Sequence, residues 1–283
     1  MITSILEKYL MRKQNAISRL SCRAVSLPIV IVGALLTMTV SFIPDAHAQK
    51  SDDATRILKS MSDYVASQKT ISLTYDSDVE VITSEVEKIQ FTSSGKVLLN
   101  RPDKIRASRT GGYADVEIVF DGKTVSATGK NINAYTQFES AGSIDQLIAK
   151  LRGMNLIAAP GADLLGSRIF DDLMADVIVA KHIGQGVVDG VECEHLAFRN
   201  LEIDWQLWVE VGARPIPRKY VITSKGVGGA PQYTLRIKEW KTDVPIGADA
   251  FVFAPPQGAN KVALDALTNI DEIPHGVATG AKK

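Results

Sequence analysis

Alternating polar and apolar residues, divided by turn signals, constrain the stretch from Val97 to Phe138 to a sheet. It reads VLLNRPDKIRAS and then VEIVFDGKTVSATGKNINAYTQF. Arg101-Pro102-Asp103, Gly111-Gly112 and Asp121-Gly122 interrupt the extended runs with residues that favour reversals of the backbone. Successive strand side chains point to opposite faces, so residues 116–121 predict a sheet with one wetter and one drier face. The stretch therefore predicts a meander of antiparallel strands.

Residues before this stretch add one helix and two further strands. Ser51 to Gln68 has apolar residues at helical spacing and acidic residues in its first turn, which favours an amphipathic helix. The period changes to two from Ile71 to Tyr75, and the same alternation returns from Lys88 to Leu99. We therefore expect about six strands in the first half of the mature chain.

Two apolar helical segments follow the meander before strands resume. Residues 143–152 and 162–174 predict helices that either fill a sheet face permanently or form a movable lid over it. Further strands are expected from Val177 onward, with a hairpin turn at Asp189-Gly190 and a last short strand at Phe251-Val252-Phe253. The fold class is therefore mainly β, of the α+β type.

Residues 1–48 have the pattern of an export signal. Five basic residues and two acidic ones accompany an apolar run from Leu27 to Val40, and Ala46-His47-Ala48 fits a cleavage site. Cleavage is expected after Ala48, and either Met1 or Met11 is the start. The apolar run is shorter than the ~20 residues of a membrane span, so we expect no span in the mature chain.

Composition excludes some classes of function for the mature chain. Of 32 basic and 32 acidic residues in the whole sequence, 27 and 30 remain after residue 48, a net charge of −3. No basic face for nucleic acid is implied. Only Cys193 remains, so no intramolecular disulfide is available, and a chain of this length can rely on one sizeable core.

The order of these elements resembles the periplasmic lipoprotein carriers of the LolA/LolB type, and more narrowly the family DUF2092. The features that carry the resemblance are the initial helix, Asn100-Arg101-Pro102-Asp103-Lys104, Phe120-Asp121-Gly122-Lys123-Thr124, and the ending from Phe251 to Ala259. The resemblance implies a single half-barrel domain over residues 49–258, in the periplasm, with residues 259–283 as a partly disordered tail. In it a strongly curved antiparallel sheet, an incomplete β-barrel, carries helices over its concave face.

The resemblance also implies a function and a role for Arg101. In the carriers, acyl chains enter the concave side when the helical lid moves aside, and the matching arginine holds the lid shut. A guanidinium can bridge several carbonyls, which suits a latch, although a solvated turn residue is the alternative. The implied partner is a hydrophobic ligand or the acyl chains of a lipoprotein. If the fold serves instead as an interaction or regulatory module, the implied partners are envelope proteins.

Tryptophans and helix residues are the candidate ligand contacts. Trp205 and Trp208 fall on opposite faces of a strand because their separation is odd, so one of them faces the concavity, as ligand contact or as core packing. From the two helical segments the candidates are Leu147, Leu151, Leu164, Leu165 and Phe170.

Catalytic and cofactor motifs are missing from the sequence, apart from Cys193-Glu194-His195. Residues two apart on a strand share a face, so a thiol hydrolase or metal site competes with two ordinary strand residues there. The sequence contains no G-x-S-x-G elbow, Walker loop or H-E-x-x-H. We therefore expect a binding protein rather than an enzyme, with no cofactor or metal.

Overall fold

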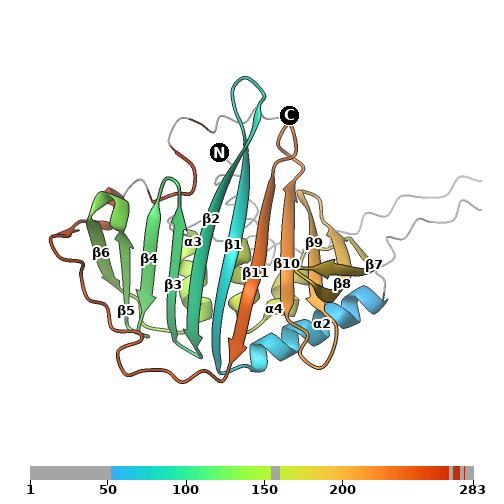
Figure 1. The fold of residues 1–283 in the computed structure, drawn as a ribbon, viewed down its shortest axis with the longest axis horizontal. Helices are drawn as coiled ribbons and strands as arrows, with labels where there is room; N and C mark the ends of the chain where they lie inside the picture. The colour runs from blue at the N-terminus through green and yellow to red at the C-terminus, as the bar shows by residue number, and fades with distance from the viewer. Residues whose placement is uncertain (1–51, 154–159, 268–269, 275–276, 278–283) are drawn as a thin grey trace, which may run out of the picture.

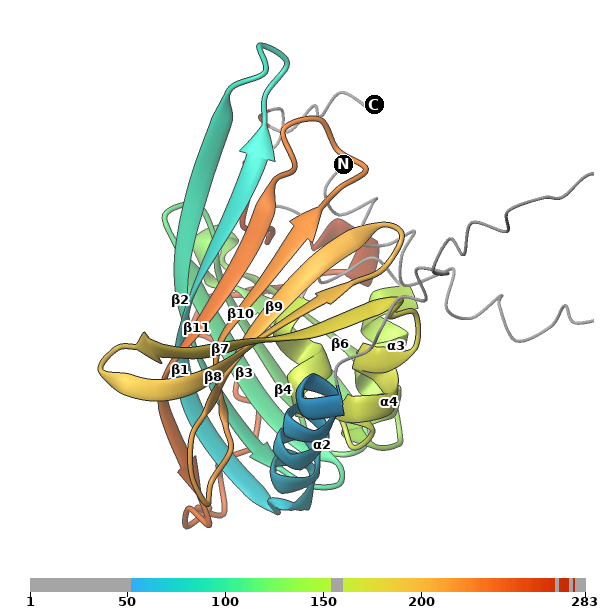
Figure 2. The ribbon, with the colours of Figure 1, turned by 90° about the vertical axis from the view of Figure 1, so that its right-hand side faces the viewer.

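A twelve-stranded sheet forms the body of the molecule and curves around its helices (Figures 1 and 2). The computed structural model describes residues 52–153, 160–267, 270–274 and 277. The expected export signal, its cleavage after Ala48 and the choice between Met1 and Met11 lie outside the described residues.

The strands follow the order β12-β6-β5-β4-β3-β2-β1-β11-β10-β9-β8-β7. All neighbours are antiparallel except β12 and β6, which are parallel. The pairing of β1 with β11, from Ile71 with Thr242 to Val79 with Tyr233, joins the two halves of the sheet. The bounds are β1 Thr70–Ile82, β2 Lys88–Asn100, β3 Lys104–Gly111, β4 Asp115–Phe120, β5 Thr124–Gly129, β6 Ala134–Glu139, β7 Val179–Val188, β8 Val191–Arg199, β9 Ile203–Glu210, β10 Pro217–Ser224, β11 Gln232–Thr242 and β12 Asn260–Lys261.

The helices are α2 (Asp52–Ser67), α3 (Ile144–Gly153) and α4 (Ile169–Met174), with 3-10 turns η2 (Lys130–Ile132), η3 (Pro160–Leu165) and η4 (Leu264–Ala266). The single helix expected over residues 162–174 is wrong, because η3 and α4 are separate elements. The backbone leaves the helical path between them, where the amide of Ser167 donates to the carboxylate of Asp145 at 2.7 Å. A hydrogen bond to another element therefore takes the place of one within the helix.

The core lies between the concave face and the helices. Alternate strand residues point to this face, and the helices contribute their apolar sides to the same cluster. Figure 2 shows the helices lying inside the curve of the sheet. Helix α2 contacts β7, β8 and β9, and it also contacts η3 and α4. Buried members from sheet and helices include Ile71, Leu73, Val97, Leu99, Phe120, Trp205, Leu207, Tyr220, Leu58, Met61, Leu147 and Leu164.

After β11 the chain crosses the convex face of the sheet. The expected strand at Phe251-Val252-Phe253 is wrong: this segment is irregular, and the guanidinium of Arg106 donates to the Val252 carbonyl at 3.2 Å in place of a strand partner. Phe253 packs on Tyr135 with ring centroids 5.5 Å apart. Strand β12 then pairs with β6, so the connection runs from β11, inside the sheet, to the edge beside β6 (Figure 1).

Beyond β12 the chain turns onto the concave face. Leu267 and Ile270 are buried in a second cluster with Val116, Ala127 and Ala134, whose side chains share the concave face in the strand register. Part of the segment expected to be a tail, residues 259–283, therefore packs on the sheet. Its apolar residues carry no strand or helix period, which is why the sequence pattern ends at residue 258. The expected fold class, an open curved sheet with helices on the concave face, is confirmed.

Candidate functional site

Helix α3 begins at a capping box on the Arg101–Pro102 turn. The Ser143 amide donates to Oε1 of Gln146 at 2.8 Å, and the Gln146 amide donates to Oγ of Ser143 at 3.3 Å. This reciprocal pair satisfies two amides that a helix start leaves without partners. The next amide, of Ile144, donates to the Pro102 carbonyl at 2.9 Å. The start of the helical cover is therefore fixed to the turn between β2 and β3.

Two polar contacts join α3 to the elements that follow it. Arg152 and Asp163 form an ion pair at 2.6 Å between α3 and η3. Asp145, in the first turn of α3, accepts the Ser167 amide just before α4. Because each contact links a different pair of segments, α3, η3 and α4 form one connected cover.

The expected ligand contacts of the helices lie together under this cover. Leu147 and Leu164 are fully buried in the main core, whereas Leu151, Leu165 and Phe170 pack against it while half-buried. Between α2 and α4, the ammonium of Lys59 in α2 lies 5.9 Å from the centroid of the Phe170 ring. The structure therefore brings all five helix candidates into one apolar cluster with residues of the sheet and of α2.

Arg101 contacts the end of α2. Its Nε donates to the Gln68 carbonyl at 3.1 Å and its Nη2 to the Val65 carbonyl at 3.5 Å. These carbonyls belong to the last turn of α2 and the residue after it, where helices leave acceptors free. Burial lowers the pKa of Arg101, and the charge of Asp145 in α3 opposes that shift. The hydrogen bonds of the expected latch thus go to α2 and not to the helices of residues 143–174.

Trp205 and Trp208 point to opposite faces of β9. Trp205 is 2% exposed and lies on the concave face, stacked on Phe198 at 3.9 Å and edge-on to Tyr220 at 5.9 Å. Trp208 lies on the convex face between the ring of His195, at 4.1 Å, and the ammonium of Lys219, at 4.9 Å. Of the two, only Trp205 is on the side of the helical cover.

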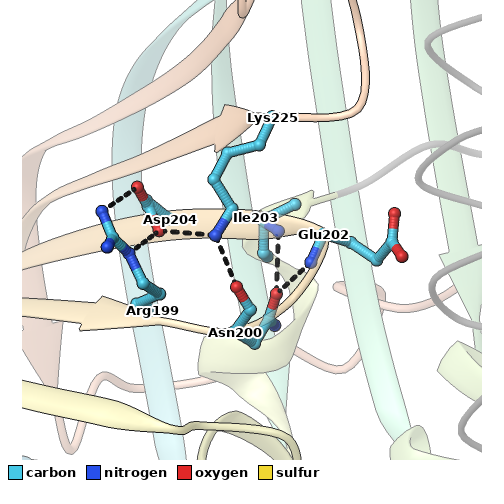
Figure 3. A network of polar contacts seen from close by, with 6 residues as sticks. All are labelled: Arg199, Asn200, Glu202, Ile203, Asp204 and Lys225. Carbon is cyan, nitrogen blue, oxygen red and sulfur yellow. Dashed lines mark hydrogen bonds and ion pairs between the residues drawn. The ribbon is translucent and has the colours of Figure 1, made fainter. Parts of the chain in front are cut away.

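A polar network at the β8–β9 turn holds the strand that carries Trp205 (Figure 3). Oδ1 of the buried Asn200 accepts the amides of Glu202 and Ile203 at 3.0 and 2.8 Å. The ammonium of Lys225 donates to the Asn200 carbonyl at 2.5 Å and pairs with Asp204 at 3.0 Å. Since Lys225 directly follows β10, the network fixes the ends of three neighbouring strands.

Arg109 and Glu272 form a largely buried polar cluster on the concave face. Nε of Arg109 lies 3.5 Å from Oε1 of Glu272, with exposed side-chain fractions of 16% and 13%. Ser77 donates to the same carboxylate at 3.3 Å. Burial raises the pKa of Glu272, although Arg109 and Ser77 act in the opposite direction. Burial also raises the pKa of the neighbouring Tyr75 to about 12.

The sequence pattern did not reveal this cluster. One signal was present: Arg109 continues the inward register of Ile105 and Ala107, so a charged residue stands at a position of the dry face. Nothing in the sequence pairs it with Glu272, because the two are brought together only by the path of the chain around the β6 edge.

Cys193 and His195 are on the convex face, and their hydrogen bonds go to different partners. The Cys193 thiol donates to the Val191 carbonyl at 3.4 Å, and burial raises its pKa. Nε2 of His195 is 2.9 Å from Oε1 of Gln206, and its ring stacks on Trp208. A nucleophilic cysteine requires a lowered thiol pKa, so this environment acts against that chemistry.

The described residues contain no group of three or more His, Cys, Asp or Glu side chains placed to hold a metal ion. Within the same part of the chain, no helix combines the length and hydropathy required to cross a membrane.

The fold and its covered concave face define an open-sheet protein whose helices and sheet enclose one apolar layer. The chain belongs to the family described as "Predicted periplasmic protein (DUF2092)", whose model matches residues 54–265. Both the expected family and the expected periplasmic location are thereby confirmed.

Similar proteins are known from both sequence and structure. Uncharacterized protein MJ0687 of Methanocaldococcus jannaschii is 26% identical over 256 residues, which cover 88% of this chain and 65% of that protein. The chain thus spans just under two thirds of the length of this curated relative.

Three solved structures illustrate the structural similarity. An uncharacterized conserved protein of Thermus thermophilus has a TM-score of 0.45 at 13% identity and covers 74% of this chain and 98% of its own. The structure of the Pseudomonas aeruginosa MucA/MucB complex has a TM-score of 0.40 at 14% identity, and the match covers 71% of this chain and 61% of that chain. The Mycobacterium tuberculosis lipoprotein LppX has a TM-score of 0.36 at 12% identity, and the match covers 70% of this chain and 100% of that chain. Scores and identities this low define no ligand for the present chain.

Proposed function

We propose that this periplasmic protein binds a hydrophobic ligand, such as the acyl chains of a lipid or lipoprotein, between the concave face of its sheet and the cover formed by α3, η3 and α4. The observation that carries the proposal is the apolar layer that these elements share. The cover lies between β6 and β7 in the chain. Polar contacts join its segments to one another, and the Ile144 amide joins its start to the turn between β2 and β3.

The chemistry of such binding is partition. Transfer of an acyl chain from water to an apolar environment is favourable by roughly 0.8 kcal/mol per buried methylene. Entry requires the cover to move away from the sheet, so the free energy of opening reduces the observed affinity. The half-buried side chains Leu151, Leu165 and Phe170 are the ones best placed to exchange protein contacts for ligand contacts.

Fluorescent fatty acid binding tests the proposal directly. We expect delipidated protein to bind dansyl-labelled undecanoic acid with increased emission, and native mass spectrometry of gently purified protein to show co-purified lipid. Leu165→Gln places an unpaired amide in the apolar layer and should weaken binding about tenfold. The control Leu201→Gln changes a leucine that is 79% exposed at the β8–β9 turn and should leave binding unchanged. Absence of binding by cooperatively folded protein would refute the proposal.

A second candidate function, an envelope interaction module, is favoured by the β7 edge. Strand β7 ends the sheet, and its Ile183 and Val187 are exposed large apolar residues. An unpaired strand edge with exposed apolar side chains suits the addition of a partner strand. If the protein captures an envelope protein, and Ile183→Lys abolishes that capture but leaves fatty acid binding intact, the result would favour an interaction module over a lipid carrier.

An enzymatic role is not part of the proposal. The buried thiol of Cys193, with its raised pKa, and the separate partners of His195 support a binding protein over a cysteine hydrolase.

A further inference from the structure

The C-terminal segment occupies part of the concave face that the proposed ligand would share. After β12, Leu267 and Ile270 are buried against the inward residues of β4, β5 and β6. Ile273 packs against the main core. The contact with the sheet is close, because a Cβ added to Gly129 of β5 would lie 3.0 Å from Cγ2 of Ile270. Residues 270–274 therefore occupy part of the concave face beside β4, β5 and the main core.

Arg109 holds this segment with incomplete hydrogen bonding. Its Nη2 donates to the Ile270 carbonyl at 2.5 Å, a contact to neutral backbone. Its Nε is 3.5 Å from the Glu272 carboxylate and is buried without a hydrogen-bond partner among the described residues. A buried donor without an acceptor carries a free-energy cost, and a guanidinium is best satisfied by a carboxylate or phosphate that takes two parallel hydrogen bonds.

Glu272 is also poorly accommodated. It lies beside Ser77, Tyr75 and Tyr233, and the pKa values of both tyrosines are raised by burial and, to a lesser extent, by the Glu272 carboxylate. Burial of a carboxylate is costly unless its hydrogen bonds are complete, and here the Ser77 hydroxyl at 3.3 Å is its one hydrogen-bond donor among the contacts of the described residues. The Glu272 carboxylate thus lies beside the Arg109 guanidinium, and neither group has all of its hydrogen bonds.

We propose that Arg109 binds the anionic headgroup of an acyl ligand, and that residues 270–274 occupy this position until the ligand displaces them. The inference rests on the proposed function and adds the class of ligand and the means of its control. The segment presents apolar Ile270 and Ile273 around a carboxylate, which is the chemical pattern of a fatty acid or an acidic lipid.

Small residues lie next to Arg109 on the concave face, and one of them is covered by the C-terminal segment. The strand neighbours of Arg109 are Gly95 in β2 and Val116 in β4, and Gly129 of β5 lies beyond Val116. The Tyr75 ring covers Gly95, whereas Ile270 together with Ile132 covers Gly129, so displacement of residues 270–274 would free space beside Gly129 for part of an acyl chain. A neutral headgroup would displace Glu272 without pairing Arg109, and a cationic one would add repulsion. Both would bind less well than an anion.

Equilibrium binding of amphiphiles with one chain length and different headgroups tests the inference on the full chain. We expect dodecanoate and dodecyl phosphate to displace a bound dansyl probe at concentrations roughly tenfold or more below those of dodecanol, because only the anions replace the Glu272 contact. Acetate and inorganic phosphate, which lack the chain, should not displace it. Hydrogen exchange of the peptide over residues 264–283 should increase when dodecanoate binds.

Two variants separate the headgroup site from the segment. Arg109→Gln should remove the preference for dodecanoate over dodecanol, while Glu272→Gln should raise the affinity for dodecanoate severalfold by weakening its competitor. The matched controls are Arg106→Gln, on the same strand but the convex face, and Asp271→Asn, an exposed carboxylate next to Glu272. Thermal melts establish that each variant is folded.

The outcomes distinguish this inference from the proposed function. Equal affinity for dodecanoate and dodecanol, unchanged by Arg109→Gln, would overturn the headgroup site and leave acyl binding standing. If acetate or inorganic phosphate alone displaces the probe as strongly as dodecanoate does, the site binds a free anion, and the proposal of an acyl ligand is overturned. No binding of any amphiphile would overturn both.

Discussion

Arg101 shows how a residue expected from a motif acquires its role from the fold. The sequence placed it in a turn after β2, and this placement is correct. Its partners could not be predicted, because they are carbonyls at the end of α2, presented by the return of the chain from helix to sheet. The turn also supports α3 through the Pro102 carbonyl, so one reversal contacts both the first helix and the cover.

Replacement of Arg101 should therefore act on stability through α2. Arg101→Leu removes two hydrogen bonds to carbonyls near the end of α2, and we expect a loss of about 1–3 kcal/mol in the free energy of unfolding. Urea denaturation followed by circular dichroism measures this loss. Arg168→Leu, at a side chain that is 73% exposed, is the control and should change stability by less than about 0.5 kcal/mol. Equal effects of the two variants would show that the α2 contacts contribute nothing.

The alternation of residues predicted most strands of this sheet. Six strands in the first half, the turns at Gly111-Gly112, Asp121-Gly122 and Asp189-Gly190, and the opposite faces of Trp205 and Trp208 agree with the structure. These features depend on neighbours in sequence. The break between η3 and α4 depends on Asp145, which is distant in sequence from the amide that it accepts, so local periodicity gave no sign of it.

The α3–η3 joint gives a prediction about the cover. Arg152 and Asp163 are both about one fifth exposed and pair at 2.6 Å, so we expect a coupling free energy of roughly 1 kcal/mol in a double-mutant cycle. Arg152→Gln, Asp163→Asn and the double variant provide the cycle, measured by urea denaturation. The exposed pair Arg56 and Asp53 in α2 is the reference, for which a smaller coupling is expected. Coupling near zero at the α3–η3 joint would mean that apolar packing alone holds the cover.

At the scale of the whole molecule, the C-terminal segment is the feature that the sequence did not predict. Its path covers the convex face, the β6 edge and then the concave face, and each contact joins residues far apart in the chain. Irregular backbone that packs by isolated apolar residues has no period to detect. The position of Glu272 beside Arg109 follows from this path alone.

The raised pKa of Glu272 predicts how this packing depends on pH. A carboxyl whose pKa is higher when folded contributes stability that is present below its unfolded pKa, about 4.5, and lost as pH rises through the raised value. The facing groups are Arg109, Ser77, Tyr75 and Tyr233 from the sheet, with Asp271 beside Glu272 in the chain. The charge of Asp78, on the convex side of β1, also raises the Glu272 pKa.

Urea denaturation of the protein and of Glu272→Gln between pH 4 and pH 7.5 measures this effect. The free energy of unfolding of the natural protein should fall relative to that of the variant as pH rises, because the glutamine does not ionise. Asp265→Asn, at an exposed carboxylate of η4 that does not act on Glu272, is the control and should follow the natural protein. Curves for Glu272→Gln and the natural protein that stay parallel would contradict the assignment.

The pairing of β1 with β11 has a consequence for how the molecule matures outside the cytoplasm. This pairing, at the centre of the sheet, joins the first strand to the last long one. Its register runs from Ile71 with Thr242 to Val79 with Tyr233, so it cannot form until nearly the whole polypeptide is present. Pairing between strands so far apart in sequence is slow. Until it is complete, each half of the sheet has an unpaired edge strand, β1 in one half and β10 or β11 in the other. A newly exported chain of this sequence is thus most exposed to misassembly just before β11 emerges, and it closes into a single sheet only once that strand has arrived.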